Sequence, residues 1–465
     1  MSARAREKPR TQADHPNWTL VTCVLASSLS FVEGSVLSVA LPAIRASFGA
    51  GAAEVQWVVN AYLLPLSALL LLGGALGDHY GRRLLLIIGT SIFAVTSLLC
   101  ALAPSLPVLL AARAGQGIGA ALLLPNSLAL LNSAFEGEKR GRAVGIWAAC
   151  GAAAAAIAPL IGGWLVGSVG WPAIFYINLP LALGAILLAL RFVTESSEAG
   201  AGRTDYAGAL LVTAGLGGVT YALTLWSAST RFSVAAIATL VAGAVLLAAF
   251  LLVELRRKQR AMMPLTLFED RCFSGLNLMT FLLYGAFGAA MLLIPYVLIT
   301  SGGYSPVQAG LAMLPLPVLM TSLSPRMGGI AMRMGPRIPL TVGPMIVALG
   351  MVLSRLMTPN SAYWTSAFPT VLVMAVGMTI AVAPLTSSVL GAVEEQHVAM
   401  ASGFNSAVAR LGGLIATALL GSVLGQEGEA LFSGFHGAMF VSAAAAAAAG
   451  IVALTMLGAV KMRKA

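Results

Sequence analysis

The stretch Gly74-Ala-Leu-Gly-Asp-His-Tyr-Gly-Arg-Arg83 is a short polar turn between two long apolar runs. The runs on either side, 55–76 and 84–103, each have about the 20 residues that an α-helix needs to cross a bilayer. The turn is too short to fold alone, so we expect it to join two membrane-spanning helices at one membrane face. This stretch therefore predicts a helical hairpin of a polytopic membrane protein.

The same pattern extends along all 465 residues, of which 58% are hydrophobic and 9% charged. Soluble proteins carry about 25% charged residues, so the composition excludes a water-soluble multidomain protein. Apolar runs bounded by charges, Pro or Gly predict an all-α protein with fourteen transmembrane helices. The expected spans are 18–41, 55–76, 84–103, 107–132, 143–166, 174–193, 207–227, 233–253, 274–300, 306–325, 338–357, 366–390, 398–424 and 437–460.

The connections divide these spans into groups of six, two and six, and none is long enough for a soluble domain. The expected units are a tail (1–17), a six-helix bundle (18–193), two linker helices (207–253), a charged linker (254–273), a second six-helix bundle (274–460) and a second tail (461–465).

The net charge of +10 reflects where the basic residues stand along the chain. If both termini are cytoplasmic, only Arg45, Arg231 and Arg355 fall on the outer side, and Arg113 and Arg410 fall within spans. This asymmetry follows the positive-inside rule, so it argues against a nucleic-acid partner. The high Ala, Gly and Arg content is typical of bacteria. We expect a bacterial cytoplasmic membrane protein, in contact with lipid and monomeric.

No arrangement of residues typical of an enzyme, a metal site or a cofactor site is present. The four His residues stand at or beyond helix ends, and the four Cys residues are scattered without metal-ligand spacing. No phosphate-binding loop, nucleotide fingerprint or Ser-His-Asp set occurs. We therefore expect no cofactor, and an ion gradient rather than ATP as the source of energy.

A weak internal repeat suggests two halves related by pseudo-symmetry. The turn Gly74–Arg83 follows the second span, and Gly329-Ile-Ala-Met-Arg-Met-Gly-Pro-Arg337 follows the tenth. The second copy carries Met332 where the first carries Asp78. The repeat favours two six-helix bundles that face each other.

Several further motifs occur in order along the chain. They are Glu33-Gly-Ser-Val-Leu-Ser-Val-Ala-Leu-Pro42, Leu110-Ala-Ala-Arg113-Ala-Gly-Gln116-Gly117-Ile-Gly119, Ala158-Pro159-Leu-Ile-Gly162-Gly163, Phe175-Tyr-Ile-Asn178-Leu-Pro180, Gly303-Tyr-Ser-Pro306 and Ala401-Ser-Gly403 with Arg410-Leu-Gly412-Gly413. With the turn at Asp78, they resemble the major facilitator superfamily, and within it the fourteen-helix drug:proton antiporters. Members of that family usually carry Asp at the position of Glu33 and Gly at that of Ala158.

Glu33 is the only acidic residue within the expected spans, and a carboxylate in hydrocarbon usually marks function. At 1.5 Å per residue it lies roughly 12 Å from the outer end of its span, and Arg113 lies roughly 9 Å deep in the fourth. Burial disfavours the charged form of a carboxyl group and a guanidinium favours it, so a change in their pairing could bind and release a proton. We expect proton coupling by Glu33 and Arg113. The alternative is a static ion pair.

Gly74, Asp78, Gly81, Arg82 and Arg83 are expected to form a gating loop, because the resemblance and the spacing favour a charge clamp over a solvated turn. Two glycines in so short a turn permit close backbone approach.

Pro159, Gly162 and Gly163 interrupt the fifth span with small residues. Small residues in membrane helices usually serve packing. The resemblance instead implies an antiporter motif that seals the protein against proton leak.

Candidate substrate contacts come from polar, aromatic and methionine side chains in the spans. Apart from the initiator, all methionines follow residue 261, which would suit an adaptable apolar wall. Arg410 could bind a substrate anion or bond to neighbouring helices. The candidates are Asn60, Tyr62, Gln116, Asn126, Asn277, Phe281, Tyr284, Met291 and Arg410, with Met279, Met313, Met320, Met374 and Met378 as further parts of the wall.

The resemblance implies export of amphiphilic drugs or antibiotics by alternating access, in exchange for protons. One acid and two arginines within the spans disfavour dicationic substrates. A proton symporter that imports a metabolite is the alternative, since it uses the same fold. A membrane enzyme or scaffold would need a catalytic cluster or a cytoplasmic domain, and the sequence contains neither.

Overall fold

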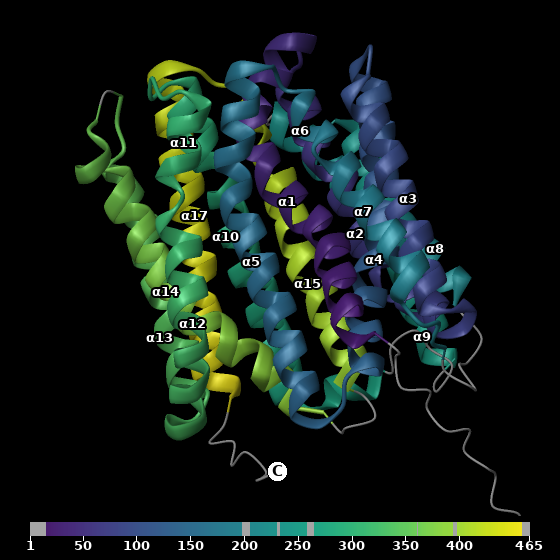
Figure 1. Ribbon diagram of the computed structural model, residues 1–465. Helices are drawn as coiled ribbons and strands as arrows, with labels where there is room; N and C mark the ends of the chain where they lie inside the picture. Colours follow the sequence, from purple (N-terminus) through teal and green to yellow (C-terminus); the bar gives the residue numbers. More distant parts are fainter. Residues whose placement is uncertain are drawn as a thin grey trace, which may run out of the picture.

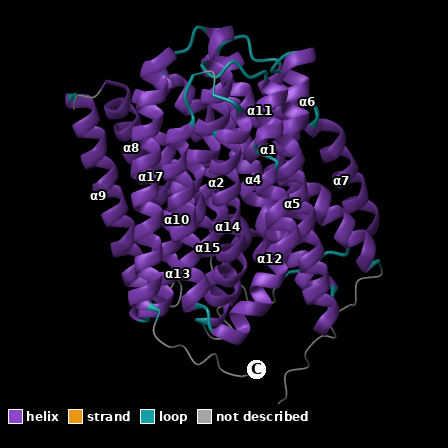
Figure 2. Ribbon diagram, turned by 90° about the vertical axis from the view of Figure 1, so that its left-hand side faces the viewer, coloured by secondary structure: helices purple, strands orange, loops and turns teal. Residues whose placement is uncertain are grey.

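The computed structural model describes residues 15–197, 205–229, 233–257, 265–359, 361–393 and 398–457. Within these ranges the chain forms helices and connecting loops, and the long helices run roughly parallel to one another (Figures 1 and 2). The expected tail 461–465, most of the tail 1–17 and part of the charged linker 254–273 lie outside the described residues.

The helices of the first half are α1 (Pro16–Phe48), α2 (Ala52–Tyr80), α3 (Arg82–Ala101), α4 (Leu106–Ala134), α5 (Gly137–Ser168), α6 (Ala173–Tyr176) and α7 (Asn178–Phe192). Two helices follow, α8 (Tyr206–Ser229) and α9 (Val234–Arg257). The second half contains the short η2 (Leu265–Glu269), α10 (Arg271–Thr300), α11 (Pro306–Ala312), α12 (Pro315–Met334), α13 (Arg337–Leu353), η3 (Ser354–Leu356), η4 (Tyr363–Thr365), α14 (Ala367–Gly391), α15 (Val398–Ala418), α16 (Gly421–Leu424) and α17 (Gly428–Met456).

Thirteen helical segments of the described chain are long and apolar enough to cross a membrane. The other long helix, α15, carries Ser402, Asn405, Ser406 and Arg410 in its first 13 residues, and these make it too polar for this group. It lies among the apolar helices and packs against α2 and α10 (Figure 1). The predicted polytopic all-α fold is confirmed.

The two halves meet through several helices, and α5 and α15 make the most extensive of these contacts. From the first half, α5 packs against α11 and α12, and from the second half, α15 packs against α2. The two added helices lie at one edge, where α8 packs against α2 and α9 covers α8 (Figure 2).

The chain begins α1 and ends α17 at the same end of the bundle, which we call the terminal face (lower side of Figure 1). We call the opposite end the far face. The internal repeat is visible at the terminal face, because α2 and α12 end at Gly81 and Gly335, with φ of 118° and 82°. Side chains rarely adopt this left-handed region, so both turns favour glycine.

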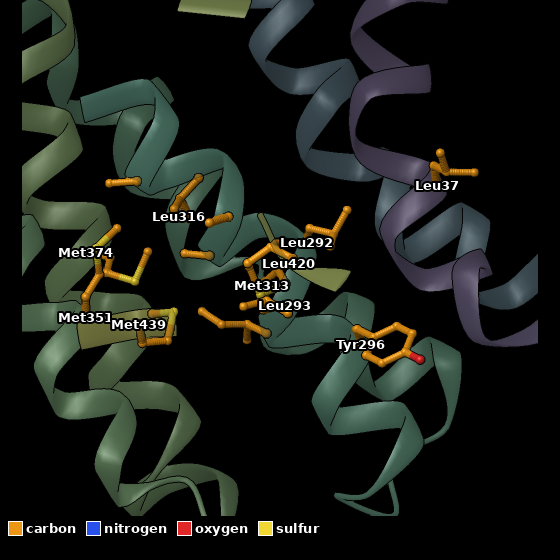
Figure 3. Close-up of a cluster of buried hydrophobic side chains, with 14 of the residues drawn as sticks. Leu37, Leu292, Leu293, Tyr296, Met313, Leu316, Met351, Met374, Leu420 and Met439 are labelled. Atoms are coloured by element: carbon orange, nitrogen blue, oxygen red, sulfur yellow. The ribbon is translucent and has the colours of Figure 1, made fainter. Parts of the chain in front are cut away.

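The second half packs around a methionine-rich core. Met313, Met351, Met374 and Met439 gather there with leucines of neighbouring helices (Figure 3). The methionines predicted to form a substrate wall belong to this core or pack against it: Met279, Met291, Met313, Met320, Met374 and Met378.

Candidate functional site

Glu33 and Arg113 form a buried ion pair between α1 and α4. Both side chains are about 1% exposed or less. The polar residues Ser27, Ser30 and Glu33 recur every three residues, so they share the buried face of α1. The structure thus brings together the two residues that were expected at similar depth, although their role in coupling stays a prediction.

Arg113 has further partners besides Glu33. Its Nε donates to the carbonyl of Val58 at 3.0 Å, and its Nη1 donates to Gln116 Oε1 at 2.8 Å. The guanidinium lies 4.7 Å from the centre of the Tyr62 ring, which is a cation–π contact. Protein groups from α2 and α4 therefore solvate the arginine on several sides.

Asn178, at the start of α7, binds the other oxygen of the carboxylate. Its Nδ2 donates to Glu33 Oε2 at 3.1 Å, while its own Oδ1 is buried without a hydrogen-bond partner in the structure. Ser97 of α3 accepts from Gln116 at 2.8 Å and from Asn178 at 3.4 Å, and so links the two amides. Glu33 thus sits in a closed network of uncharged amides and hydroxyls.

Asn178 and Ser97 are site residues that the sequence analysis did not single out. Asn178 belongs to a motif of the resemblance, and it directly follows the short helix α6, whose Phe175 lies 5.9 Å from Arg113. An amide within that motif was the available signal. The direction of its side chain depends on the turn between α6 and α7, which the sequence does not fix.

The gating loop is held by residues of the terminal face. Asp78 accepts from Arg82 at 2.8 Å, and Arg83 donates to the carbonyl of Leu190 at 2.8 Å. Glu195 caps the start of α3 by accepting from the backbone amides of Arg83 and Leu84, at 2.9 and 3.1 Å. Glu195 is a further partner that the sequence analysis missed. Whether the loop gates transport stays a prediction.

Of the two motif glycines Gly74 and Gly81, only Gly81 is required for reasons of space. A Cβ on Gly81 would meet the Glu195 carboxylate at 2.7 Å, and one on Gly74 would only touch Pro125 at 3.5 Å. Gly81 therefore fits the cap tightly, whereas Gly74 has ordinary contact distances.

The motif on α5 lies where the two halves of the protein meet. A Cβ on Gly163 would be 2.4 Å from the carbonyl oxygen of Pro306, and one on Gly310 of α11 would be 2.5 Å from that of Pro159. A Cβ on Gly162 would instead meet Val36 of α1 at 2.3 Å. The motif thus allows the backbone of α5 to touch α1 on one side and the second half on the other.

The far face is closed by polar contacts between the halves as well. Arg45 Nη1 donates to the Tyr296 hydroxyl at 2.9 Å, and that hydroxyl donates to the Leu424 carbonyl at 2.9 Å. Arg45 also lies 3.7 Å from Glu427. Together with the α5–α11 contact, these bonds join α1, α10 and α17 at the far face.

A cavity of about 330 Å³ lies between α10, α14 and α15. Its lining residues are Tyr284, Thr386, Val389, Leu390, Ser402, Asn405, Ser406, Ala409 and Arg410. Thr386 and Ser406 are exposed, so the cavity is open to solvent. The predicted contacts Tyr284 and Arg410 line it, and no methionine does.

The other predicted substrate contacts lie outside this lining. Asn126 donates to the carbonyls of Gly73 and Leu122, at 2.9 and 2.7 Å, and so braces α2 against α4. Asn60 is fully buried and neither of its amide atoms has a hydrogen-bond partner in the structure. Whether either side chain contacts substrate stays a prediction.

Asn277 lies beside the cavity and accepts from Asn405 at 3.1 Å. Phe281 and Met291 are residues of α10, and both are partly buried. Tyr62 and Gln116 belong to the Glu33 network. For all these residues, substrate contact stays a prediction.

A second cavity, of about 480 Å³, lies at the far face beside Tyr304 and Tyr363. Burial raises the pKa of both tyrosine hydroxyls, and the neighbouring Tyr304 adds to the rise at Tyr363. Both hydroxyls therefore stay neutral at physiological pH.

Two acids outside the expected spans are also buried. Helix α9 continues to Arg257, four residues beyond the expected span, and Glu254 within it is only 2% exposed. Asp205 is also buried and pairs with Arg257 where α8 begins. Sequence alone placed these acids in connecting loops, because they stand next to basic residues. In the described residues no group of His, Cys, Asp and Glu is placed to hold a metal ion.

The fold and these motifs agree with the known proteins that the chain resembles. Residues 23–251 match the family model described as Major Facilitator Superfamily. The multidrug resistance protein Stp of Mycobacterium tuberculosis is 36% identical over 87% of this chain and 75% of its own. This chain belongs to the major facilitator superfamily. It is therefore a multi-pass membrane transporter rather than an enzyme.

Other relatives have names that describe resistance or export. The cephamycin export protein CmcT of Amycolatopsis lactamdurans is 34% identical over 88% of this chain and 85% of its own. The tetracenomycin C resistance and export protein of Streptomyces glaucescens is 29% identical over 92% and 81%.

Solved structures support the fold. A peptide transporter, POT, in complex with sulfate aligns with a TM-score of 0.68 at 12% identity, over 94% of each chain. A bacterial homologue of the human lysosomal transporter Spinster, inward-facing and unoccupied, aligns with a TM-score of 0.61 at 17% identity, over 99% of each chain.

Proposed function

We propose that this transporter exports amphiphilic drugs or antibiotics in exchange for protons, with Glu33 as the proton carrier. The observation that carries the proposal is the buried Glu33–Arg113 pair with its uncharged amide partners. The names of the relatives support the substrate class, because they include a multidrug resistance protein and two proteins of antibiotic export.

The network can hold Glu33 in both protonation states. The carboxylate accepts from Arg113 and from Asn178 Nδ2. A protonated carboxyl group needs an acceptor for its O–H, and the buried, unpartnered Oδ1 of Asn178 offers one when the amide group flips. The same amide therefore serves the charged and the neutral acid.

Arg113 also remains solvated when Glu33 is neutral. It keeps the Val58 carbonyl, the Gln116 amide and the face of the Tyr62 ring. Proton binding thus removes the attraction between α1 and α4 without leaving a bare charge in the bilayer.

A weaker link between α1 and α4 can change access to the cavity. Helix α1 also packs against α5, α7 and α10, and α10 belongs to the second half. In the state described, Glu33 is buried, the far face is closed and the cavity is open to solvent. If the basic terminal face is cytoplasmic, this is an inward-facing state with Glu33 deprotonated, in which substrate enters the cavity. A proton from outside reaches Glu33 only after the far face has opened.

The test uses the purified full-length chain in liposomes with an imposed proton gradient. Glu33→Gln should abolish proton-driven uptake of a fluorescent amphiphile into those liposomes in which the transporter is inserted inside out. Glu429→Gln, the same change at an exposed acid of α17, should transport like the wild type. Continued uphill pumping by Glu33→Gln would refute the assignment of the carrier.

The direction of flux separates antiport from symport. An antiporter moves substrate against the inward flow of protons, whereas a symporter moves both the same way. Substrate and proton fluxes of the same sign would replace export by import of a metabolite.

A further inference from the structure

Arg410 is a second arginine at membrane depth, and its surroundings differ from those of Arg113. It lies on α15 and lines the cavity. In the described part of the chain it makes no hydrogen bond or ion pair, and Tyr284 lines the same cavity. No acidic residue is among the nine that line the cavity.

An unpaired cation inside a membrane protein is costly, and such residues usually face a cavity or a partner. Glu33 does not serve as that partner, because Arg113 and Asn178 bind its two oxygens. The open cavity therefore leaves the guanidinium of Arg410 available to a group that enters from solvent.

The neighbouring side chains carry hydroxyl groups, which can donate hydrogen bonds to an anion. The hydroxyls of Tyr284, Ser402 and Ser406 line the cavity, and none of them makes a hydrogen bond within the described residues. Asn405 is already engaged, since its Nδ2 donates to Thr280 at 2.7 Å and to Asn277 at 3.1 Å. A guanidinium with free hydroxyls suits an anion with several oxygen atoms, because Arg can donate two parallel hydrogen bonds to a carboxylate.

The opposite part of the lining is apolar and consists of Val389, Leu390 and Ala409. These side chains suit a hydrocarbon or aromatic body beside the anionic group. A volume of about 330 Å³ is at the lower end of the range for small-molecule sites.

We propose that Arg410 binds the carboxylate of monoanionic amphiphiles, with hydroxyl groups from Tyr284, Ser402 and Ser406 around the anion and the apolar wall against its body. This inference rests on the proposed export function and narrows its substrates to carboxylated amphiphiles.

The test compares two probes that differ only in charge, a dansyl-labelled fatty acid and its methyl ester. Their dissociation constants are measured by fluorescence on the purified full-length chain near neutral pH. The wild type should bind the acid about 10-fold more tightly than the ester, the size expected for one charge-assisted hydrogen-bonded contact.

Substitutions at the site should change this ratio in a graded way. Arg410→Gln should bring the ratio of the two affinities to about 1. Arg410→Lys should give a ratio between this value and that of the wild type, because lysine keeps the positive charge but cannot donate two parallel hydrogen bonds to a carboxylate. Arg355→Gln is the matched control, an exposed arginine of the far face, and should keep the wild-type ratio. If Arg410→Gln does not fold, Arg410→Lys and Tyr284→Phe provide the same comparison.

An unchanged ratio in Arg410→Gln or Arg410→Lys, or a wild type that binds the ester as tightly as the acid, would overturn the inference. The proposed function fails separately, when the wild type moves neither probe nor any cationic or neutral amphiphile under a proton gradient. Proton-driven export of neutral compounds alone would leave the function intact and exclude the carboxylate site.

Discussion

The two arginines at membrane depth in this transporter occupy opposite kinds of environment. Arg113 is enclosed in the first half, with a carboxylate, an amide, a carbonyl and an aromatic ring as partners. Arg410 borders an open cavity of the second half, whose lining in the described part of the chain includes the Tyr284 hydroxyl but no acid. The first environment is complete without a ligand, whereas the second lacks a partner for its charge.

This difference separates two tasks that a coupled transporter must perform. A buried charge whose partners all belong to the protein can respond when one of those partners is protonated, because no substrate competes for the charge. A charge that faces solvent can respond to a substrate. We therefore expect the same substitution to have different consequences in the two halves.

The largest difference should follow from replacing each arginine by leucine. Arg113→Leu leaves the Glu33 carboxylate buried with Asn178 as its only partner, and breaking a buried pair costs about 3–5 kcal/mol. Arg410→Leu removes no hydrogen bond and should change the free energy of unfolding by less than about 1 kcal/mol. Thermal or denaturant unfolding of both purified variants measures this contrast, and equal losses would contradict it.

A double variant provides the control for the first half. Adding Glu33→Leu to Arg113→Leu removes the unpaired carboxylate, so stability should rise by about 2 kcal/mol or more above that of the single variant. Proton-driven transport should remain absent in the double variant. A double variant less stable than Arg113→Leu would show that the pair is not coupled in this way.

The next effect concerns the contact that joins the two halves. Gly163→Ala would place a Cβ 2.4 Å from the Pro306 carbonyl oxygen, so α5 and α11 must move apart, and overpacking of this kind costs about 1–3 kcal/mol. Transport should fall several-fold in the vesicle assay. Gly167→Ala on the same helix meets nothing within 4 Å and is the matched control. Equal transport by both variants would argue against a tight seal at this contact.

A smaller effect should come from Asn178. Asn178→Asp adds a carboxyl group next to Glu33, and a neighbouring like charge disfavours ionisation, so a proton is retained to higher pH. The pH of half-maximal exchange should rise by about one unit, as read from the pH profile of transport. A purely structural asparagine would lower the rate at every pH without moving the midpoint, and that outcome would remove Asn178 from the proton site.

The sequence could predict that Glu33 and Arg113 lie at similar depth in the membrane, because the position of a residue along a helix sets its depth. With a constant rise per residue, a count from the ends of two spans places both side chains at one level. The fold class could also be predicted, since apolar length and charge placement decide which segments cross the bilayer.

Other features depend on side-chain direction and therefore required the structure. The approach of Asn178 to Glu33 depends on the turn after α6, and the lack of an acid near Arg410 depends on how α10, α14 and α15 meet. The methionines were expected around a cavity because of their number in the second half, but several fill its core instead. Glu254 was assigned to a connection because it precedes Arg256 and Arg257.

The backbone contact between Gly163 and Pro306 has a mechanical consequence. The atoms nearest to Gly163 there are backbone atoms of Pro306 and Val307, so the two halves can turn about this point with little repacking of side chains. Gly163 lies 26 residues from the start of α5 at Gly137, which is roughly 39 Å along the helix axis. A rotation of about 10° at this fulcrum would displace the other end of α5 by about 7 Å, so a helix of this length acts as a lever that converts a small local rotation into a wide opening at the terminal face.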